Sequence, residues 1–230
     1  MSRLVSLMAA DGHRLSAYEN GPSGGEAEAA VVILQEIFGV NAHIRSVADL
    51  YSKHGYAVVA PALFDRVERD VEIAYTPEGV ERARSLAGRL TEAGVLADIA
   101  AAVEHARTLT RGGKVAVVGY CLGGSYAWLS ATRLAVDAAV GYYGSKVVQF
   151  IAEEPRAPVI LHFGDKDRGI PLSDVEAIQA ARPTLPVYVY DAGHGFNREG
   201  GVNYSEAAAT LALTRTLDFL AVALRGAERA

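Results

Sequence analysis

The sequence predicts a mainly parallel α/β fold, with helices on both faces of the sheet and a β-hairpin at the N-terminus. From Ala30 onward, short apolar runs alternate with longer stretches of helical periodicity, which is the pattern of repeated βα units. Several of these runs are apolar at every position, as strands covered on both faces must be. The alternation continues without a linker, so we predict one domain spanning residues 1–230.

The first 25 residues predict the hairpin and a loop after it. Val5–Ala9 and Arg14–Tyr18 are strand-like runs, and Asp11-Gly12 between them favours a type I′ turn because both residues tolerate positive φ. The composition of Gly21–Gly25 indicates a surface loop.

Periodicity separates the rest of the chain into strands and helices. The apolar runs predicted as strands are Ala30–Leu34, Ala57–Ala60, Lys114–Gly119, Ala138–Tyr142, Pro158–Phe163 and Val187–Tyr190. The stretches predicted as helices are His43–His54, Pro77–Leu90, Ala93–Leu109, Gly124–Arg133, Leu172–Ala181 and Tyr204–Leu224. Phe64–Ala93 contains no clear strand and is predicted as an excursion of helices and loops, which either borders a site or is a plain surface insertion.

The composition excludes several classes of protein. The chain has 230 residues, 22 Lys and Arg against 27 Asp and Glu, and a net charge of −5. Its single cysteine, Cys121, excludes an internal disulfide and a cysteine-cluster metal site. Without a Lys/Arg-rich run, we expect neither nucleic acid nor an anionic membrane as a partner. We predict a cytoplasmic protein, because Leu4–Ala10 is short for a signal peptide and no run approaches the ~20 apolar residues of a membrane helix.

The strongest chemical signal is Gly119-Tyr120-Cys121-Leu122-Gly123-Gly124, which follows an apolar run and opens a helical pattern. This is the nucleophile elbow with cysteine in place of serine, where glycines admit a tight strand-to-helix turn. The start of a helix favours a thiolate, and the Leu122 N–H is predicted to face an acyl oxyanion. The alternative is that Cys121 is a small buried apolar residue in an ordinary turn.

A thiol nucleophile needs a base and a residue that orients the base. His194 lies between glycines after the predicted strand Val187–Tyr190, and Asp167 follows the strand that ends at Phe163. Both loops belong to the carboxyl edge of the sheet, where open α/β sheets place their sites. We predict His194 as the base and Asp167 as its acid, with Asp165 as the alternative acid.

Glu36 follows the strand Ala30–Leu34 and therefore belongs to the same carboxyl edge. Its neighbours Ile37 and Phe38 are apolar, which favours a functional carboxylate over a solvated loop residue.

Taken together, these segments resemble the dienelactone hydrolases, a cysteine-dependent family of the α/β-hydrolase superfamily. The matching segments lie within residues 30–225 and are Gln35–Asn41, Gly119–Gly124, Gly141–Gly144, His162–Asp167 and Ala192–Phe196.

The resemblance implies an α/β-hydrolase fold and a triad of Cys121, Asp167 and His194. It implies Glu36 as a fourth functional residue that protects the thiol until substrate binds. It further implies an oxyanion hole made by the N–H groups of Leu122 and Ile37.

The resemblance also implies that arginines hold a substrate carboxylate. Arg198 matches one of them, and the second falls within residues 81–89, where Arg82 is preferred over Arg84 and Arg89. Tyr142 either lines the pocket or simply ends a strand.

The expected reaction is the opening of a carboxylated enol-lactone, such as carboxymethylenebutenolide, without a metal or organic cofactor. The expected partner is this small molecule, and the chain is expected to be a monomer or a small homo-oligomer. The alternatives are a broader carboxylesterase or thioesterase with the same triad, and a non-catalytic α/β-hydrolase scaffold.

Overall fold

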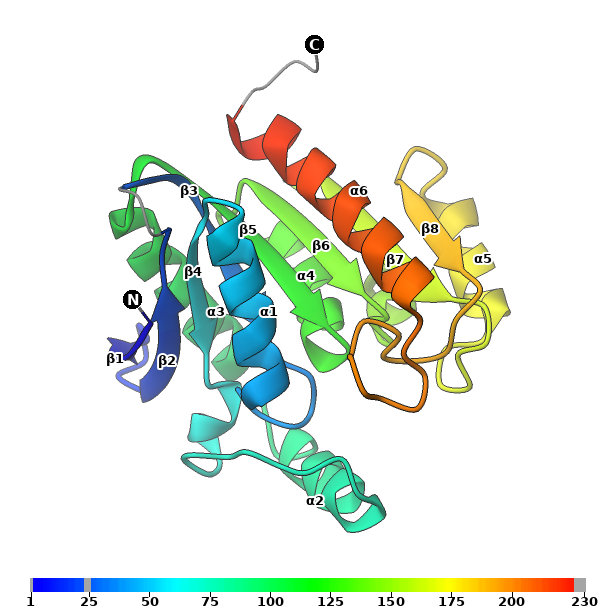
Figure 1. Cartoon of the computed structure of the whole chain (residues 1–230), viewed down its shortest axis with the longest axis horizontal. Helices are drawn as coiled ribbons and strands as arrows, with labels where there is room; N and C mark the ends of the chain where they lie inside the picture. The colour runs from blue at the N-terminus through cyan, green and yellow to red at the C-terminus, as the bar shows by residue number, and fades with distance from the viewer. Residues whose placement is uncertain (1, 23–25, 226–230) are drawn as a thin grey trace. The chain divides into compact units, whose positions relative to one another are not determined.

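The computed structural model describes residues 2–22 and 26–225, and Figure 1 shows their helices and strands. The chain divides into two compact units, residues 1–117 and 118–230, and the division falls within strand β5 (Thr110–Tyr120). The single domain expected from the sequence stays a prediction. The loop expected at Gly21–Gly25 lies in part outside the described residues.

The first unit contains the predicted hairpin and the first parallel strands. Its elements before β5 are β1 (Arg3–Met8), β2 (Arg14–Asn20), β3 (Ala27–Leu34), α1 (Ala42–Lys53), β4 (Ala57–Pro61), the 3-10 helix η1 (Leu63–Arg66), α2 (Pro77–Ala87) and α3 (Glu92–Thr108). The strands pair in the order β1-β2-β4-β3, antiparallel at the hairpin and at β2/β4 but parallel at β3/β4. Helices α1 and α3 lie on opposite faces of these strands (Figure 1).

The predicted type I′ turn of the hairpin is wrong. Only Gly12 has a positive φ, of 85°, and Asp11 does not share it. Gly12 N donates to the carbonyl oxygen of Ala9, and Ala9 N donates to that of His13, both at 2.9 Å. The connection is therefore a three-residue loop with glycine in the left-handed position, which is the next most common hairpin geometry.

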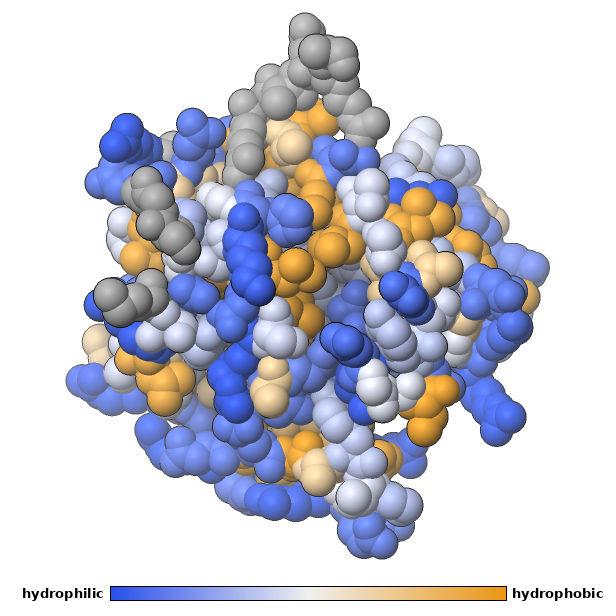
Figure 2. All heavy atoms as spheres, in the orientation of Figure 1, coloured by the Kyte–Doolittle hydropathy of each residue, from blue (hydrophilic) through white to orange (hydrophobic). Residues whose placement is uncertain are grey.

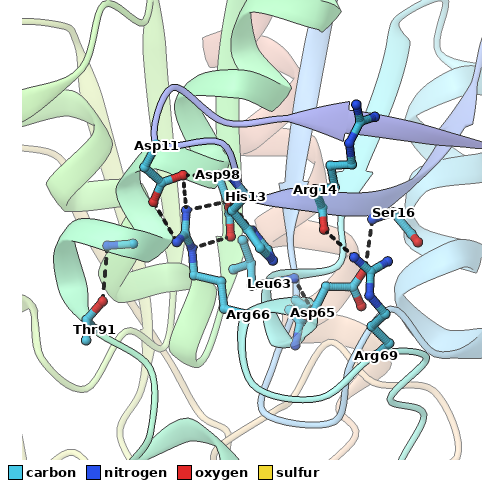
Figure 3. A network of polar contacts seen from close by, with 12 residues as sticks. Asp11, His13, Arg14, Ser16, Leu63, Asp65, Arg66, Arg69, Thr91 and Asp98 are labelled. Carbon is cyan, nitrogen blue, oxygen red and sulfur yellow. Dashed lines mark hydrogen bonds and ion pairs between the residues drawn. The ribbon is translucent and has the colours of Figure 1, made fainter.

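A buried ionic network fastens this hairpin loop to η1 and α3 (Figure 3). Asp98 of α3 is fully buried and accepts hydrogen bonds from Arg66 Nε and Nη2, each at 2.8 Å. Arg66 also donates to Asp11, and His13 Nδ1 lies 2.9 Å from Asp98 Oδ1. These contacts offset the free-energy cost of burying the Asp98 carboxylate, since a buried charge is tolerated only when it is paired.

The segment Phe64–Ala93, whose sequence showed no clear strand, contains the starts of two helices that threonine side chains cap. Thr76 caps α2 by accepting from Gly79 N at 3.1 Å, and Pro77 occupies the first turn. Thr91 caps α3 through Gly94 N in the same way. The prediction that Phe64–Ala93 consists of helices and loops is confirmed.

The second unit contains three parallel strands in the order β6-β7-β8. Its elements after β5 are α4 (Leu122–Arg133), β6 (Ala138–Tyr142), the 3-10 helix η2 (Val147–Phe150), β7 (Val159–Gly164), α5 (Leu172–Ala181), β8 (Val187–Tyr190) and α6 (Glu206–Arg225). Helices α4 and α6 cover opposite faces of these strands (Figure 1). Every residue of β6 and β7 is buried, as predicted for strands covered on both faces.

Helix α6 bears on the expectation that no stretch is long and apolar enough to cross a membrane. By length and composition alone, Glu206–Leu224 could cross a membrane, although the core helix of a soluble protein passes the same test. Beside the C-terminal end of α6, apolar residues reach the surface among hydrophilic ones (Figure 2), and Val222 is 56% exposed. The cytoplasmic location stays a prediction.

Candidate active site

Cys121 lies on a sharp turn between β5 and α4. Its φ of 54° and ψ of −110° are a strained combination for a residue with a side chain. Such strain costs about 1–3 kcal/mol and persists only where the surrounding structure imposes it. The half-buried thiol is therefore presented on a turn whose geometry is fixed by its neighbours.

The glycines around Cys121 are required by close backbone approach. A Cβ at Gly119 would lie 1.9 Å from the carbonyl oxygen of Gly123, and a Cβ at Gly124 would lie 2.4 Å from that of Tyr142. Cys121 N donates to the same Tyr142 carbonyl at 3.0 Å, which ties the turn to the end of β6. Leu122 is the first residue of α4, where N–H groups lack an acceptor within the helix.

The structure brings Cys121, His194 and Asp167 into one hydrogen-bonded line. His194 Nε2 lies 3.1 Å from Cys121 Sγ, and His194 Nδ1 lies 2.6 Å from Asp167 Oδ2. Asp167 is buried, and its other oxygen accepts from Gly169 N at 2.8 Å. This is the arrangement of a nucleophile, its base and the residue that orients the base.

The choice between the two candidate acids follows from their hydrogen bonds. Asp165 Oδ1 accepts from the backbone N–H of Ala192 at 3.2 Å, and Lys166 and Asp191 form an ion pair beside it. Asp167, and not Asp165, is hydrogen-bonded to His194. Asp165 instead joins the loop after β7 to the loop after β8.

The charge of His194 follows from opposing effects on its ring. Burial lowers the pKa of His194, but the hydrogen bonds to the Asp167 carboxylate and to Cys121 outweigh it and raise the pKa to about 10. The imidazole is therefore positively charged at neutral pH. An imidazolium beside a cysteine sulfur stabilises a thiolate.

Sequence reasoning did not find two residues that hold the His194 loop. Asn203 Nδ2 donates to the His194 carbonyl oxygen at 2.9 Å. Tyr143 has a φ of 40°, and its ring centroid lies 5.0 Å from that of His194. Nothing in the sequence indicated a role for Asn203. Tyr143 lies in the segment Gly141–Gly144, which resembles the family, but it was not singled out because it comes after the end of the predicted strand.

The side chain of Tyr142 lies in the interior of the second unit. Its hydroxyl oxygen is 2.7 Å from Thr216 Oγ1 of α6, and its ring stacks on those of Tyr120 and His162. His162 Nε2 lies 3.1 Å from the same Thr216 oxygen, and burial lowers the pKa of His162 to about 3, so this histidine is neutral. Tyr142 as a pocket residue stays a prediction; its backbone carbonyl is the group that holds Cys121.

Glu36 and Ile37 lie in the loop after β3, within the first unit. Glu36 is only 4% exposed, so it is not a solvated loop carboxylate. Its Oε2 accepts a hydrogen bond from the hydroxyl of Tyr75 at 3.1 Å. Tyr75, in the segment before α2, carried no signal in the sequence.

The candidate substrate arginines occupy different surroundings. Arg198 is half-buried, four residues after His194, and a Cβ at Gly201 would lie 2.8 Å from its Cζ, so its guanidinium lies along the 198–201 turn. Arg82 of α2 is exposed and forms an ion pair with Glu68. Arg89 donates to the Val67 carbonyl oxygen at 3.2 Å. The carboxylate-binding roles of Arg198 and Arg82 stay predictions.

Within residues 2–22 and 26–225, no group of three or more His, Cys, Asp or Glu side chains is placed to hold a metal ion.

Comparison with known proteins shows to which family this chain belongs. Residues 15–224 match the model of the dienelactone hydrolase family. This chain belongs to the dienelactone hydrolase family. Membership makes it a lactone or ester hydrolase.

This member of the dienelactone hydrolase family is similar to its curated relatives over nearly the whole chain. It is 39% identical to a carboxymethylenebutenolidase of Pseudomonas putida, over 94% of this chain and 95% of the relative. It is 36% identical to carboxymethylenebutenolidase 1 of Cupriavidus pinatubonensis, over 95% of this chain and 96% of the relative.

A solved structure confirms the predicted α/β-hydrolase fold. A Klebsiella pneumoniae protein assigned to the dienelactone hydrolases superposes with a TM-score of 0.83 and 28% identity, over 95% of this chain and 99% of that one.

Proposed function

We propose that this protein opens a carboxylated enol-lactone, a dienelactone, through an acyl-enzyme formed on Cys121. The observation that carries the proposal is the hydrogen-bonded line from Asp167 through His194 to a cysteine on a strained elbow. The carboxymethylenebutenolidase name of the relatives supports the substrate class.

In the first step, the Cys121 thiolate attacks the lactone carbonyl carbon and forms a tetrahedral intermediate. The N–H groups of Leu122 and Ile37 are the proposed donors to its oxyanion. Collapse of the intermediate breaks the ring C–O bond and leaves a thioester. The departing enolate oxygen takes a proton from the His194 imidazolium, so His194 becomes neutral.

In the second step, neutral His194 removes a proton from water, and the resulting hydroxide attacks the thioester carbonyl. The C–S bond breaks, the free acid leaves, and the thiolate and the imidazolium are restored together. Asp167 keeps Nδ1 of His194 as a hydrogen-bond donor throughout, because its carboxylate can only accept.

Glu36 is the proposed guard of the thiol. A carboxylate near sulfur disfavours a second negative charge and can accept the S–H proton, so Glu36 opposes the thiolate that His194 favours. In this proposal, substrate binding displaces Glu36, whose carboxylate takes the S–H proton, and the Cys121 thiolate is released. Arg198 and Arg82 are the proposed partners of the substrate carboxylate, and Tyr142 a proposed pocket residue.

These steps use only side chains, backbone N–H groups and water, so the proposal includes no metal or organic cofactor. We further propose that the protein acts in the cytoplasm, as a monomer or small homo-oligomer, without nucleic acid or membrane as a partner.

A paired substrate screen tests this function. Lactones and esters, each with and without a carboxylate, are incubated with the enzyme, and the products and the intact protein mass are followed together. We expect the carboxylated enol-lactone to be hydrolysed fastest, with a transient acyl adduct that Cys121→Ala lacks.

Two results would contradict the proposal. Faster turnover of neutral p-nitrophenyl esters than of the dienelactone would indicate a broader carboxylesterase or thioesterase. No adduct and no turnover with any substrate would indicate a non-catalytic scaffold.

A further inference from the structure

A tyrosine from the segment between η1 and α2 reaches the proposed guard residue. Tyr75 precedes Thr76, the cap of α2, and its hydroxyl donates to Glu36 Oε2 at 3.1 Å. Glu36 is 4% exposed, whereas Tyr75 is 36% exposed. The hydrogen bond therefore joins a buried carboxylate to a side chain that reaches the surface of the first unit.

The direction of this hydrogen bond is fixed by Asn41. Asn41 Oδ1 caps α1 by accepting from Ile44 N at 3.1 Å, which places its amide nitrogen on the other side. That nitrogen, Nδ2, donates to the Tyr75 hydroxyl oxygen at 3.0 Å. Because an amide nitrogen can only donate, the single hydroxyl proton of Tyr75 is left for Glu36.

The ring of Tyr75 is held independently of its hydroxyl. Its centroid lies 4.2 Å from that of Phe38, two residues after Glu36. Removing the hydroxyl alone therefore leaves the ring contact in place.

The backbone before Tyr75 is also fixed against the Glu36 loop. Ile73 N donates to the Phe38 carbonyl oxygen at 3.0 Å. Gly39 has a φ of 83°, and a Cβ there would lie 1.8 Å from the Val71 carbonyl oxygen, so the two backbones touch. Tyr75 and Glu36 thus belong to one packed pair of loops.

A donor to a carboxylate stabilises its negative charge and restrains its orientation, and a buried carboxylate depends on such donors. We propose that Tyr75, oriented by Asn41, is a positioning residue that keeps Glu36 in the buried arrangement from which it suppresses the reactivity of Cys121. This inference rests on the proposed guard role of Glu36. Tyr75 acts through Glu36 and takes no part in the chemistry at sulfur.

The test is a double-mutant cycle on thiol reactivity without substrate. Cys121 alkylation by iodoacetamide is timed by intact mass between pH 6 and pH 9 in the wild type, Tyr75→Phe, Glu36→Gln and the double variant. Loss of the Tyr75 hydroxyl should speed alkylation roughly three- to tenfold, the range that corresponds to one hydrogen bond of ordinary net strength. In the Glu36→Gln background, the same loss should change the rate by less than about twofold.

Two further variants separate positioning from structure. Asn41→Asp keeps a good helix cap but replaces the donor with an acceptor, which draws the Tyr75 proton away from Glu36. It should speed alkylation as Tyr75→Phe does, although the Tyr75 ring is intact. Tyr204→Phe, at a tyrosine of similar exposure in the second unit, should leave the rate unchanged.

The outcomes distinguish this inference from the proposed function. If Glu36→Gln alkylates at the wild-type rate, the guard role fails and the inference fails with it. If Glu36→Gln changes the rate but Tyr75→Phe does not, or if the two changes multiply fully, only the role of Tyr75 is overturned.

Discussion

At the scale of single residues, the proposed chemistry depends on Cys121 and His194. The φ of 54° at Cys121 places the sulfur on the turn, and the glycines around it allow the backbones to approach. The cation on His194 then has one buried carboxylate and one sulfur as its hydrogen-bond partners.

Replacing Cys121 with alanine should abolish turnover while the protein stays folded. Removing the nucleophile of a triad lowers kcat by about 10⁴-fold or more, because the acyl-enzyme no longer forms. Steady-state hydrolysis together with circular dichroism checks this expectation. Retained activity in a folded variant would refute covalent catalysis.

The raised pKa of His194 predicts how stability depends on pH. A histidine in the unfolded chain titrates near pH 6.5, and in the folded protein His194 titrates near pH 10. The folded state therefore binds the extra proton between these values, and the resulting stability is complete below about pH 6.5 and lost as the pH rises towards 10.

Urea unfolding of the wild type and of His194→Gln at pH 6, 8 and 10 measures this contribution. The wild type should lose more free energy of unfolding than the variant over this range. Equal losses in the two proteins would show that His194 does not bind the extra proton.

At the scale of elements, loops are held by hydrogen bonds between segments that are distant in sequence. The Asp98–Arg66–His13 network of Figure 3 joins the hairpin loop, η1 and α3 within the first unit. Asp98 is fully buried, whereas the Arg111–Glu26 ion pair on the surface of the same unit is largely exposed.

Asp98→Asn should therefore destabilise the protein strongly. Removing one charge leaves Arg66 without its buried partner, and breaking a buried pair costs about 3 kcal/mol or more. Arg111→Ala should leave stability nearly unchanged, because exposed ion pairs contribute little. Chemical denaturation of both variants measures the difference, and similar losses would contradict a special role for the network.

The sequence predicted those elements whose signal is local. Ala138–Tyr142, Leu172–Ala181 and Val187–Tyr190 were predicted with the bounds that the structure shows, because periodicity and flanking turn residues determine them. Gly119–Gly124 marked the elbow because its glycines are required by contacts with nearby backbone.

Features that depend on distant contacts could not be predicted. The prediction of the hairpin turn failed because the loop has three residues, with positive φ at Gly12 and not at Asp11. Asp11 instead pairs with Arg66, 55 positions away, a contact that the local sequence does not indicate. Tyr75 was missed for the same reason, since its partner Glu36 lies 39 positions away. Asn203 was missed because no local motif marks its contact with the His194 carbonyl, although both residues lie in the connection between β8 and α6. The acid could be narrowed to Asp165 or Asp167, but only the hydrogen bond to His194 separates them.

At the scale of the whole molecule, the net charge of the protein and the charge of the proposed substrate have the same sign. The chain carries a net charge of −5, which disfavours the approach of an anionic lactone. Productive binding of a carboxylate then requires a local cation. Arg198, in the loop that also carries His194, is the proposed source of that attraction.

Arg198→Ala should raise KM for a carboxylated lactone about 10- to 100-fold, the loss expected for a hydrogen bond to a charged group, and should scarcely change KM for a neutral ester.

Salt gives a second readout, because screening weakens attraction between charges. In the wild type, added salt should therefore lower kcat/KM for the carboxylated substrate more than for the neutral ester, and Arg198→Ala should remove that difference. Arg111→Ala changes the net charge of the protein by the same amount as Arg198→Ala does, and it therefore serves as the control. If both variants raise KM for the carboxylated lactone equally, the effect comes from the change in overall charge, and Arg198 does not anchor the substrate.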